Sequence, residues 1–237
     1  MKIQFVILFI TMMIPIISLG IEKERHLRIY GTVTDFQGKC IEGAKVEILN
    51  EKFNSLYQTT TNSFGKYELF VNTGKYLALM AVKDYKEKFL EFWAWNLEPL
   101  SDLQINPRID GLELYCLNAF KPQGAFPSIM VYFRPMSLKR FNDHLIMNKS
   151  KGDDLIDISP EISKKDIEVT VNNKLVKILE VNKVREKANN TQSIIGYLIQ
   201  IEIPKLSLPF ETARISLVVN DNVTKEKGEA LLFWNFK

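Results

Sequence analysis

The sequence predicts an all-β protein made of two β-sandwich domains in tandem. Apolar and polar residues alternate at every second position, and glycines interrupt this alternation at short, regular intervals. The length agrees with this prediction, because 237 residues of which 46% are hydrophobic can bury two modest cores. We expect the first domain over residues 26–100 and the second over residues 110–237.

Strand signals follow one another closely in the first domain. Ala44, Val46 and Ile48 alternate with Lys45 and Glu47, which places apolar groups on one face and charges on the other. The predicted strands lie at 26–34, 44–48, 59–61, 67–71 and 76–82. Short strands at regular spacing, separated by glycine-containing turns, are typical of a sandwich.

The glycines of this domain also form a linked pattern with their neighbours. Its parts are Gly31-x-Val33-x-Asp35-x-x-Gly38, Ile41-x-Gly43-Ala44-x-Val46, Thr61-Asn62-x-x-Gly65-x-Tyr67 and Gly74-x-Tyr76. The pattern resembles the carboxypeptidase regulatory-like domain over residues 28–90. The resemblance implies a transthyretin-like sandwich, often grouped with carbohydrate-binding-like folds, that is an accessory module without catalytic residues. Cys40 stands where a proline is usual in that family, and the His-x-x-Glu pair of the peptidase domain is missing from the sequence.

Residues 89–97 form an aromatic stretch with large apolar side chains on both faces of a predicted strand. One face would carry Phe89, Trp93, Trp95 and Leu97, and the other Leu90, Phe92 and Ala94. Two interpretations stay open. Packing between the domains is favoured, because most large aromatic residues are substantially buried. Alternatively, exposed tryptophans spaced two residues apart stack on sugar rings.

The second domain is predicted as an immunoglobulin-like sandwich of unknown family, although it lacks the Cys-Trp-Cys core marker. Residues 99–107 resemble a linker, and the strand that contains 129–133 is expected to stop at Pro135. The predicted strands are 112–117, 129–133, 167–171, 175–181, 197–203, 213–219 and 230–236.

Residues 1–20 are predicted to be a secretory signal peptide. Lys2 precedes an apolar run from Phe5 to Leu19, and Ser18 and Gly20 supply small residues before a cleavage point. The run is shorter than the ~20 residues that usually span a bilayer, so an uncleaved anchor is the less favoured alternative. We therefore expect a secreted or cell-envelope protein without a transmembrane span after cleavage.

Composition argues against several classes of function. The formal net charge is +3 and the lysines are scattered among acids, which gives no footprint for nucleic acid. His26 and His144 belong to no metal or triad motif, so we expect no catalytic residues, no metal and no cofactor. Cys40 and Cys116 either pair as a disulfide in an oxidising compartment or remain two small buried hydrophobic residues.

Two polar segments of the second domain suggest sites. Arg134, which follows the strand that contains Tyr132, either holds an acidic partner or pairs with a neighbouring acid. The acidic segment 152–157 either holds calcium or is a solvated loop, and the second interpretation is favoured. The candidate ligand-binding residues are therefore Trp93, Trp95, Tyr132 and Arg134.

These features favour an exported, non-catalytic protein that binds a ligand or protein partner at the cell envelope or outside the cell. One alternative is a carbohydrate-binding module that uses the surface aromatics. A second, less favoured, is a hydrolase with a carboxylate pair such as Asp153 and Asp157. Glycosylation sequons occur at Asn148, Asn189 and Asn222, and they matter only in a eukaryotic secretory pathway.

Overall fold

The computed structural model describes residues 26–124, 126–147, 155–203 and 212–235, and it confirms the all-β prediction. The first strands are β1 (His26–Thr32), β2 (Lys45–Leu49), β3 (Ser55–Thr60), β4 (Lys66–Asn72), β5 (Tyr76–Val82), β6 (Phe92–Leu97) and β7 (Leu103–Gln104). The remaining elements are β8 (Leu112–Phe120), β9 (Ser128–Ser137), α1 (Leu138–Met147), β10 (Leu155–Ile156), the 3-10 turn η1 (Lys164–Asp166), β11 (Ile167–Val171), β12 (Lys174–Leu175), β13 (Ile178–Lys187), β14 (Ser193–Glu202), β15 (Thr212–Asn220) and β16 (Lys227–Asn235).

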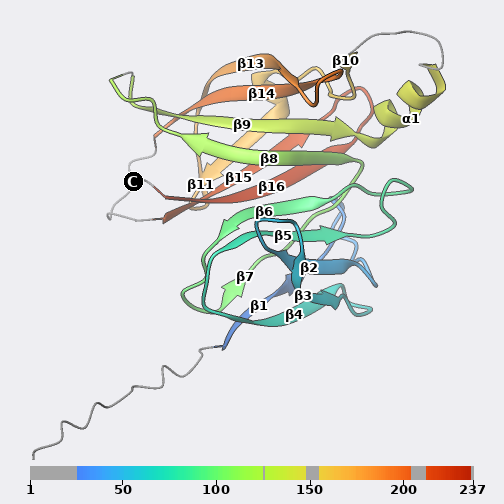
Figure 1. Ribbon diagram of the computed structural model, residues 1–237, viewed down its shortest axis with the longest axis vertical. Coiled ribbons are helices and arrows are strands. Elements are labelled where there is room, and N and C mark those ends of the chain that lie inside the picture. Colours follow the sequence, from blue (N-terminus) through green and yellow to red (C-terminus); the bar gives the residue numbers. More distant parts are fainter. Residues whose placement is uncertain (1–25, 125, 148–154, 204–211, 236–237) are drawn as a thin grey trace, which may run out of the picture.

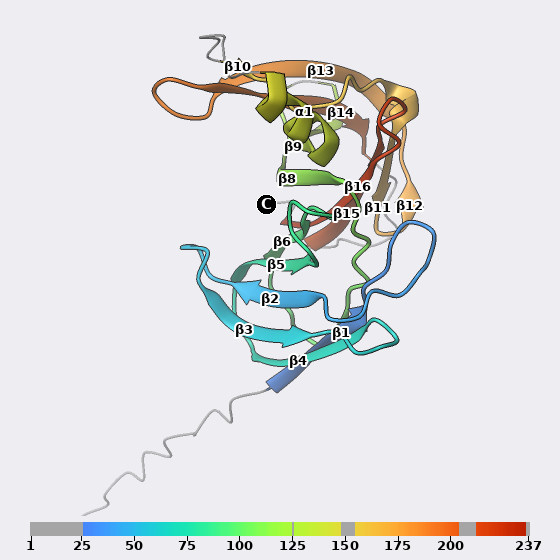
Figure 2. The ribbon, with the colours of Figure 1, turned by 90° about the vertical axis from the view of Figure 1, so that its right-hand side faces the viewer.

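The strands form three sheets that stack as layers (Figures 1 and 2). A three-stranded sheet has the order β4-β1-β7, and a five-stranded sheet contains β10, β14, β9 and β8 with β13 paired to β14. Between them lies an eight-stranded sheet in the order β12-β11-β15-β16-β6-β5-β2-β3. This middle sheet includes strands from both predicted domains.

The two parts of the chain join where β6 pairs with β16. The pairing is parallel, with Ala230 opposite Trp93, Leu231 opposite Ala94 and Leu232 opposite Trp95. Because strand alternation is shared across this pairing, residues of β6 and β16 contribute together to each face of the middle sheet. The structure is therefore more tightly joined than two sandwiches connected by a flexible linker.

A separate hydrophobic core covers each face of the middle sheet. Phe92, Ala94 and Leu231 belong to the core shared with the three-stranded sheet. Trp93, Trp95, Ala230 and Leu232 belong to the core shared with the five-stranded sheet. A strand that is buried on both faces must be apolar on both, which explains the aromatic composition of β6.

The predicted faces of β6 are correct for all but its last residue. Leu97 lies in the core with Phe92 and Ala94, although the alternation places it beside Trp93 and Trp95. The reason is Asn96, whose φ of 57° is left-handed and interrupts the two-residue period.

The segment expected as a linker is part of the first sandwich. β7 pairs in parallel with β1, and Ile105, which follows β7, is 1% exposed. Tyr67 donates a hydrogen bond from its hydroxyl to the Ile105 carbonyl at 2.9 Å. A Cβ on Gly31 would lie 1.7 Å from the same carbonyl oxygen, so only glycine permits this close approach.

The expectation that a strand stops at Pro135 is wrong. β9 continues to Ser137, and Pro135 lies opposite Leu114 of β8. On its other side β9 pairs with β14 only as far as Phe133. Beyond that point no N–H is needed for a second neighbour, so proline is tolerated in the strand.

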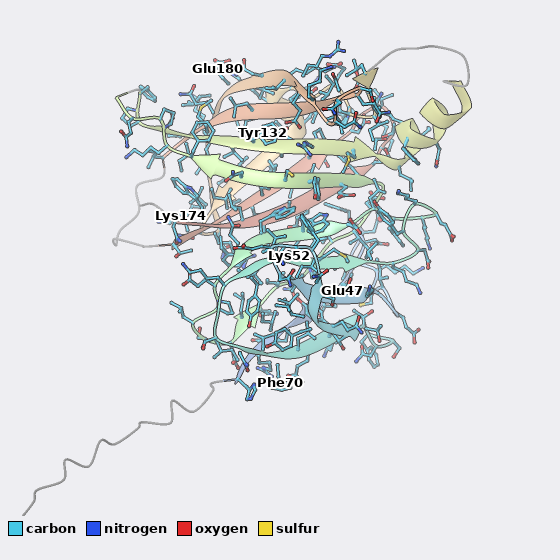
Figure 3. The ribbon with its side chains drawn as sticks, viewed as in Figure 1. Glu47, Lys52, Phe70, Tyr132, Lys174 and Glu180 are labelled. Atoms are coloured by element: carbon cyan, nitrogen blue, oxygen red, sulfur yellow. The ribbon has the colours of Figure 1, made fainter. Side chains whose placement is uncertain are left out.

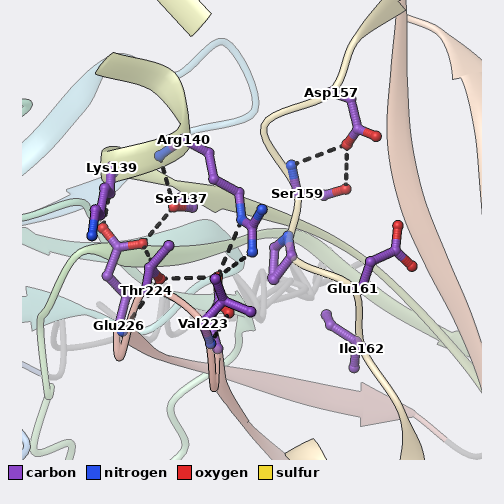
Figure 4. Close-up of polar contacts among 12 residues, drawn as sticks. Ser137, Lys139, Arg140, Asp157, Ser159, Glu161, Ile162, Val223, Thr224 and Glu226 are labelled. Carbon is purple, nitrogen blue, oxygen red and sulfur yellow. Dashed lines mark hydrogen bonds and ion pairs between the residues drawn. The ribbon is translucent and has the colours of Figure 1, made fainter. Parts of the chain in front are cut away.

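Helix α1 follows β9 directly and was not predicted (Figure 4). Ser137 accepts a hydrogen bond from the Arg140 N–H at 3.1 Å, and Glu226 accepts one from the Lys139 N–H at 2.9 Å. The guanidinium of Arg140 also pairs with Asp221 at 2.9 Å. These contacts satisfy free N–H groups at the start of the helix and attach it to the turn between β15 and β16. Among the described residues, no helix has the length and apolar character needed to cross a membrane.

Candidate ligand-binding groove

The two tryptophans proposed for sugar stacking are buried at the junction. Trp93 is 4% exposed and Trp95 is 6% exposed, with their rings stacked at a centroid distance of 4.8 Å. Phe53 and Tyr115 each make edge contacts with both indoles. A stacking platform needs an exposed ring face, so the structure corrects this expectation: these indoles are packing residues at the junction.

A buried carboxyl group accompanies the tryptophans. Glu113 is 2% exposed and accepts a hydrogen bond from Trp93 Nε1 at 2.9 Å. Burial, with a smaller contribution from the nearby charge of Glu91, raises the pKa of Glu113 to about 8. This carboxyl group is therefore largely protonated at neutral pH.

Tyr132, labelled in Figure 3, lies with Arg134 on β9 of the five-stranded sheet. The two side chains contact each other and Glu186. Tyr132 donates to Glu186 at 2.5 Å, and Arg134 forms an ion pair with the same carboxylate. The Tyr132 ring also occupies the space beside Gly196, where a Cβ would lie 2.4 Å from its hydroxyl. Tyr132 and Arg134 thus contact a neighbouring acid, and Tyr132 also lies against a glycine of β14. Trp93 and Trp95 lie on a different sheet, so the four candidate residues are divided between two sheets.

The two cysteines are free in the structure. Cys40 is exposed on the loop between β1 and β2, and Cys116 is partly buried in an irregular part of β8 with a φ of 54°. The disulfide considered from the sequence is therefore not formed, because the two thiols occupy different sandwiches and have no sulfur partner.

The acidic segment is described only from Leu155 onward, so Asp153 and the sequon residue Asn148 lie outside the described residues. Asp157 accepts a hydrogen bond from Ser159 at 2.9 Å and lies 3.6 Å from Lys183. Within the described part of the chain, no group of three or more His, Cys, Asp or Glu side chains could hold a metal ion. Asn189 and Asn222 donate to Gln192 and Asp166, respectively.

A groove that the sequence did not indicate crosses the outer face of the three-stranded sheet and reaches β3 at the edge of the middle sheet. We call it the Tyr30 groove, and its volume is about 620 Å³. It is lined by Tyr30, Gly31, Thr32, Thr59, Thr60, Asn62, Lys66, Tyr67, Glu68 and Gln104. Strand alternation explains the lining, because Ile29 and Leu69 point into the core and their neighbours Tyr30 and Glu68 point outward.

The aromatic ring of this groove is held from one side. The Arg28 guanidinium lies 4.1 Å from the centroid of the Tyr30 ring. Arg28 is in turn paired with Glu68 at 3.2 Å and with Asp102 at 3.5 Å. A cation on one ring face and two carboxylates behind it restrict the ring orientation before any ligand arrives.

The rest of the lining offers polar groups without partners. In the part of the chain that the structure describes, the side-chain hydroxyls of Thr32, Thr59 and Thr60 have no hydrogen-bond partner, and the Lys66 ammonium group has no ion pair. Gln104 donates one amide hydrogen to Asn106 at 3.4 Å and keeps its other groups for a ligand. The groove thus combines one oriented ring with several hydrogen-bonding groups.

The groove is built largely from the segment that matches a known family. The family model for the carboxypeptidase regulatory-like domain matches residues 28–88, which include most of β1 and all of β3 and β4. Residues 28–88 are a carboxypeptidase regulatory-like domain. Of the groove residues only Gln104, on β7, lies outside the match. A search of curated proteins finds no relative that matches this chain.

Solved structures give distant likenesses over most of the chain. A Bacteroides uniformis protein provisionally named as carbohydrate-binding has 10% identity and a TM-score of 0.29, with 89% of this chain and 99% of that chain covered. A DUF3823 family protein from Bacteroides ovatus has 9% identity and a TM-score of 0.28, covering 88% and 99%. BcpA, the major pilin subunit of Bacillus cereus, has 10% identity and a TM-score of 0.30, covering 88% and 69%. At these values none of the three supports an argument about function.

Proposed function

We propose that this chain is an exported, non-catalytic binding protein of the cell envelope or extracellular space, and that its ligand is a carbohydrate held in the Tyr30 groove. The observation that carries the proposal is the oriented Tyr30 ring, which lies in a groove with threonine hydroxyls and a lysine ammonium group that have no partner among the described residues. Export depends on the predicted signal peptide over residues 1–20, which lie outside the described residues.

The chemistry of the lining suits a sugar. An aromatic face packs against the C–H groups of a pyranose ring, and hydroxyl and amide groups exchange hydrogen bonds with its alcohols. Within the groove Lys66 and Glu68 carry opposite charges, so neither anionic nor cationic ligands are favoured by charge alone. A volume of about 620 Å³ falls in the range typical of small-molecule sites.

The test is a glycan and peptide array probed with residues 21–237, followed by calorimetry on the best glycan. We expect the variant Tyr30→Ala to bind that glycan about tenfold more weakly, because stacking on an aromatic ring contributes roughly 1 kcal/mol or more. Phe70→Ala is the matched control: Phe70 is an aromatic residue of β4 that is 60% exposed but does not line the groove (Figure 3).

The outcomes separate the parts of the proposal. Equal binding by Tyr30→Ala and by the parent protein would place the sugar elsewhere and reject the groove. Peptide binding that depends on Tyr30, with no glycan bound, would keep the binding role and reject the carbohydrate ligand. Turnover of a glycan by the purified protein would reject the non-catalytic assignment.

A further inference from the structure

A second cleft lies at the junction of the two sandwiches, away from the Tyr30 groove. We call it the seam cleft, and its volume is about 360 Å³. It is lined by Glu51, Lys75, Tyr76, Leu77, Asn96, Leu97, Glu98, Thr212, Phe233, Trp234 and Asn235. No residue that the structure describes lines both this cleft and the Tyr30 groove.

The seam cleft forms because β6 and β16 stop pairing before either strand ends. The last pair is Leu232 with Trp95. The next residue of β6 is Asn96, whose left-handed φ of 57° turns β6 away from its neighbour. β16 continues to Asn235 and, among the described residues, pairs there only with β15. Within the described part of the chain, the end of β16 is therefore a short free edge inside the sheet.

The backbone of this edge points into the cleft. The N–H of Arg214 donates to Asn172 Oδ1 at 2.8 Å and its carbonyl accepts from the Asn172 N–H at 2.8 Å, so both groups point toward β11. Arg214 lies opposite Phe233 in the antiparallel β15–β16 pair. Residues opposite each other in such a pair direct their backbone groups either both inward or both outward. Phe233 therefore directs its backbone groups away from β15, toward the end of β6 and the cleft, and Asn235, two residues on, does the same.

The remaining walls provide an apolar floor and an acidic rim. Tyr76 and Leu97 are buried beside the partly buried Phe233. On the rim, Glu98 pairs with Lys75 at 3.5 Å, whereas Glu51 has no ion pair among the described residues. The rim thus has one more carboxylate than ammonium groups, which favours a basic ligand.

We infer that the seam cleft binds an extended peptide segment with basic side chains, which adds to the free end of β16 as a short strand. Hydrogen bonds to the Phe233 carbonyl and the Asn235 N–H hold the peptide backbone, and the apolar floor receives one side chain. Glu51 receives a lysine or arginine at the rim. This inference does not depend on the carbohydrate proposal, because the two sites share no residue.

The test uses capped six-residue peptides that alternate valine with either lysine or glutamate, titrated into residues 21–237 by calorimetry. We expect the valine–lysine peptide to bind and the valine–glutamate peptide to bind at least about fivefold more weakly. Two further peptides carry N-methyl groups on either the odd-numbered or the even-numbered residues. One of them should lose binding and the other should bind unchanged, because only one edge of an added strand faces β16. Equal binding by the two N-methylated peptides would overturn strand addition.

A pair of variants tests the protein side. Asn235→Pro removes the backbone N–H that faces the cleft, and Asn235→Ala keeps it. Both variants lose the hydrogen bond that Thr212 donates to Asn235 at 2.6 Å, so they are matched in this respect. We expect Asn235→Pro to weaken peptide binding about tenfold and Asn235→Ala to have little effect. Thermal unfolding of both variants reports whether the fold is retained.

A third variant separates this site from the Tyr30 groove. Tyr30→Ala should leave peptide binding unchanged, since Tyr30 does not line the seam cleft. Glu51→Gln should reduce the preference for the valine–lysine peptide. Absence of peptide binding, or loss of it in Tyr30→Ala, would overturn the inference without affecting the carbohydrate proposal.

Discussion

The tryptophans of β6 and the tyrosine of β1 belong to the same sandwich but have opposite surroundings. Trp93 is 4% exposed beneath Phe53 and Tyr115, whereas Tyr30 is only partly buried and lines an open groove. Both strands have a face that points away from the core of the first sandwich. The face of β6 is covered by β8, and that of β1 remains open. Coverage by a distant strand, and not aromatic content, decides which residues can meet a ligand.

The largest effect should come from Trp93→Ala. Removing a buried indole leaves a cavity in the core of the junction, so we expect a loss of about 3–5 kcal/mol in the free energy of unfolding. Urea denaturation measures this loss. The corresponding change on the open face, Tyr30→Ala, should lower the free energy of unfolding by less than about 1 kcal/mol. Equal losses of stability in the two variants would contradict the difference between the covered face of β6 and the open face of β1.

The second effect depends on pH and concerns Glu113. Its folded-state pKa is raised to about 8 by burial, while the unfolded chain ionises near the ordinary value of 4.5. Between these values the folded state binds the extra proton, so stability falls as pH rises, by up to roughly 1.4 kcal/mol per pH unit. Glu113→Gln keeps an acceptor for Trp93 and removes this dependence.

We therefore expect Glu113→Gln to gain stability relative to the parent protein as pH rises from 5 to 9, measured by thermal unfolding. Glu87→Gln is the control, because Glu87 is an exposed glutamate. A constant difference between Glu113→Gln and the parent across this pH range would contradict a buried, protonated carboxyl group at the junction.

The smallest effect on stability should come from Arg28→Gln. The Arg28 side chain is 41% exposed, and its ion pairs with Glu68 and Asp102 lie at the surface. Surface ion pairs contribute at most about 1 kcal/mol. Because Arg28 orients Tyr30, glycan affinity should still fall a few-fold. Calorimetry measures the affinity and denaturation measures the stability of the same sample. Unchanged affinity would show that Arg28 is not needed to orient the Tyr30 ring.

Local features of the fold could be predicted from the sequence because they depend on neighbouring residues. Alternation located most of the strands and the apolar faces of β6, and the glycine pattern indicated the regulatory-like domain. The single strand predicted over residues 175–181 is instead divided between β12 and β13, which lie in different sheets. Leu97 was misplaced because a left-handed Asn96 gives no clear sequence signal. Helix α1 was missed because its capping carboxylate, Glu226, comes from a distant turn.

The candidate sites were harder to predict, because they depend on contacts between distant segments. Nothing in residues 89–97 indicates that β16 will pair with β6, since this pairing joins the middle of the chain to its last described strand. Tyr30 could have been found, because it occupies the outward position between the apolar Ile29 and the glycine that follows. The seam cleft could not, because it requires two strands that diverge.

The pairing of β6 with β16 has a consequence for biosynthesis. β16 spans Lys227–Asn235, so the ribosome must synthesise all the strands from β7 to β15 before β6 acquires its parallel neighbour. Until then the nascent chain carries an unpaired strand edge with two tryptophans beside it, a surface prone to association with other chains. Loss of β16 would therefore expose an edge of the first sandwich as well, although the two strands lie far apart in the sequence.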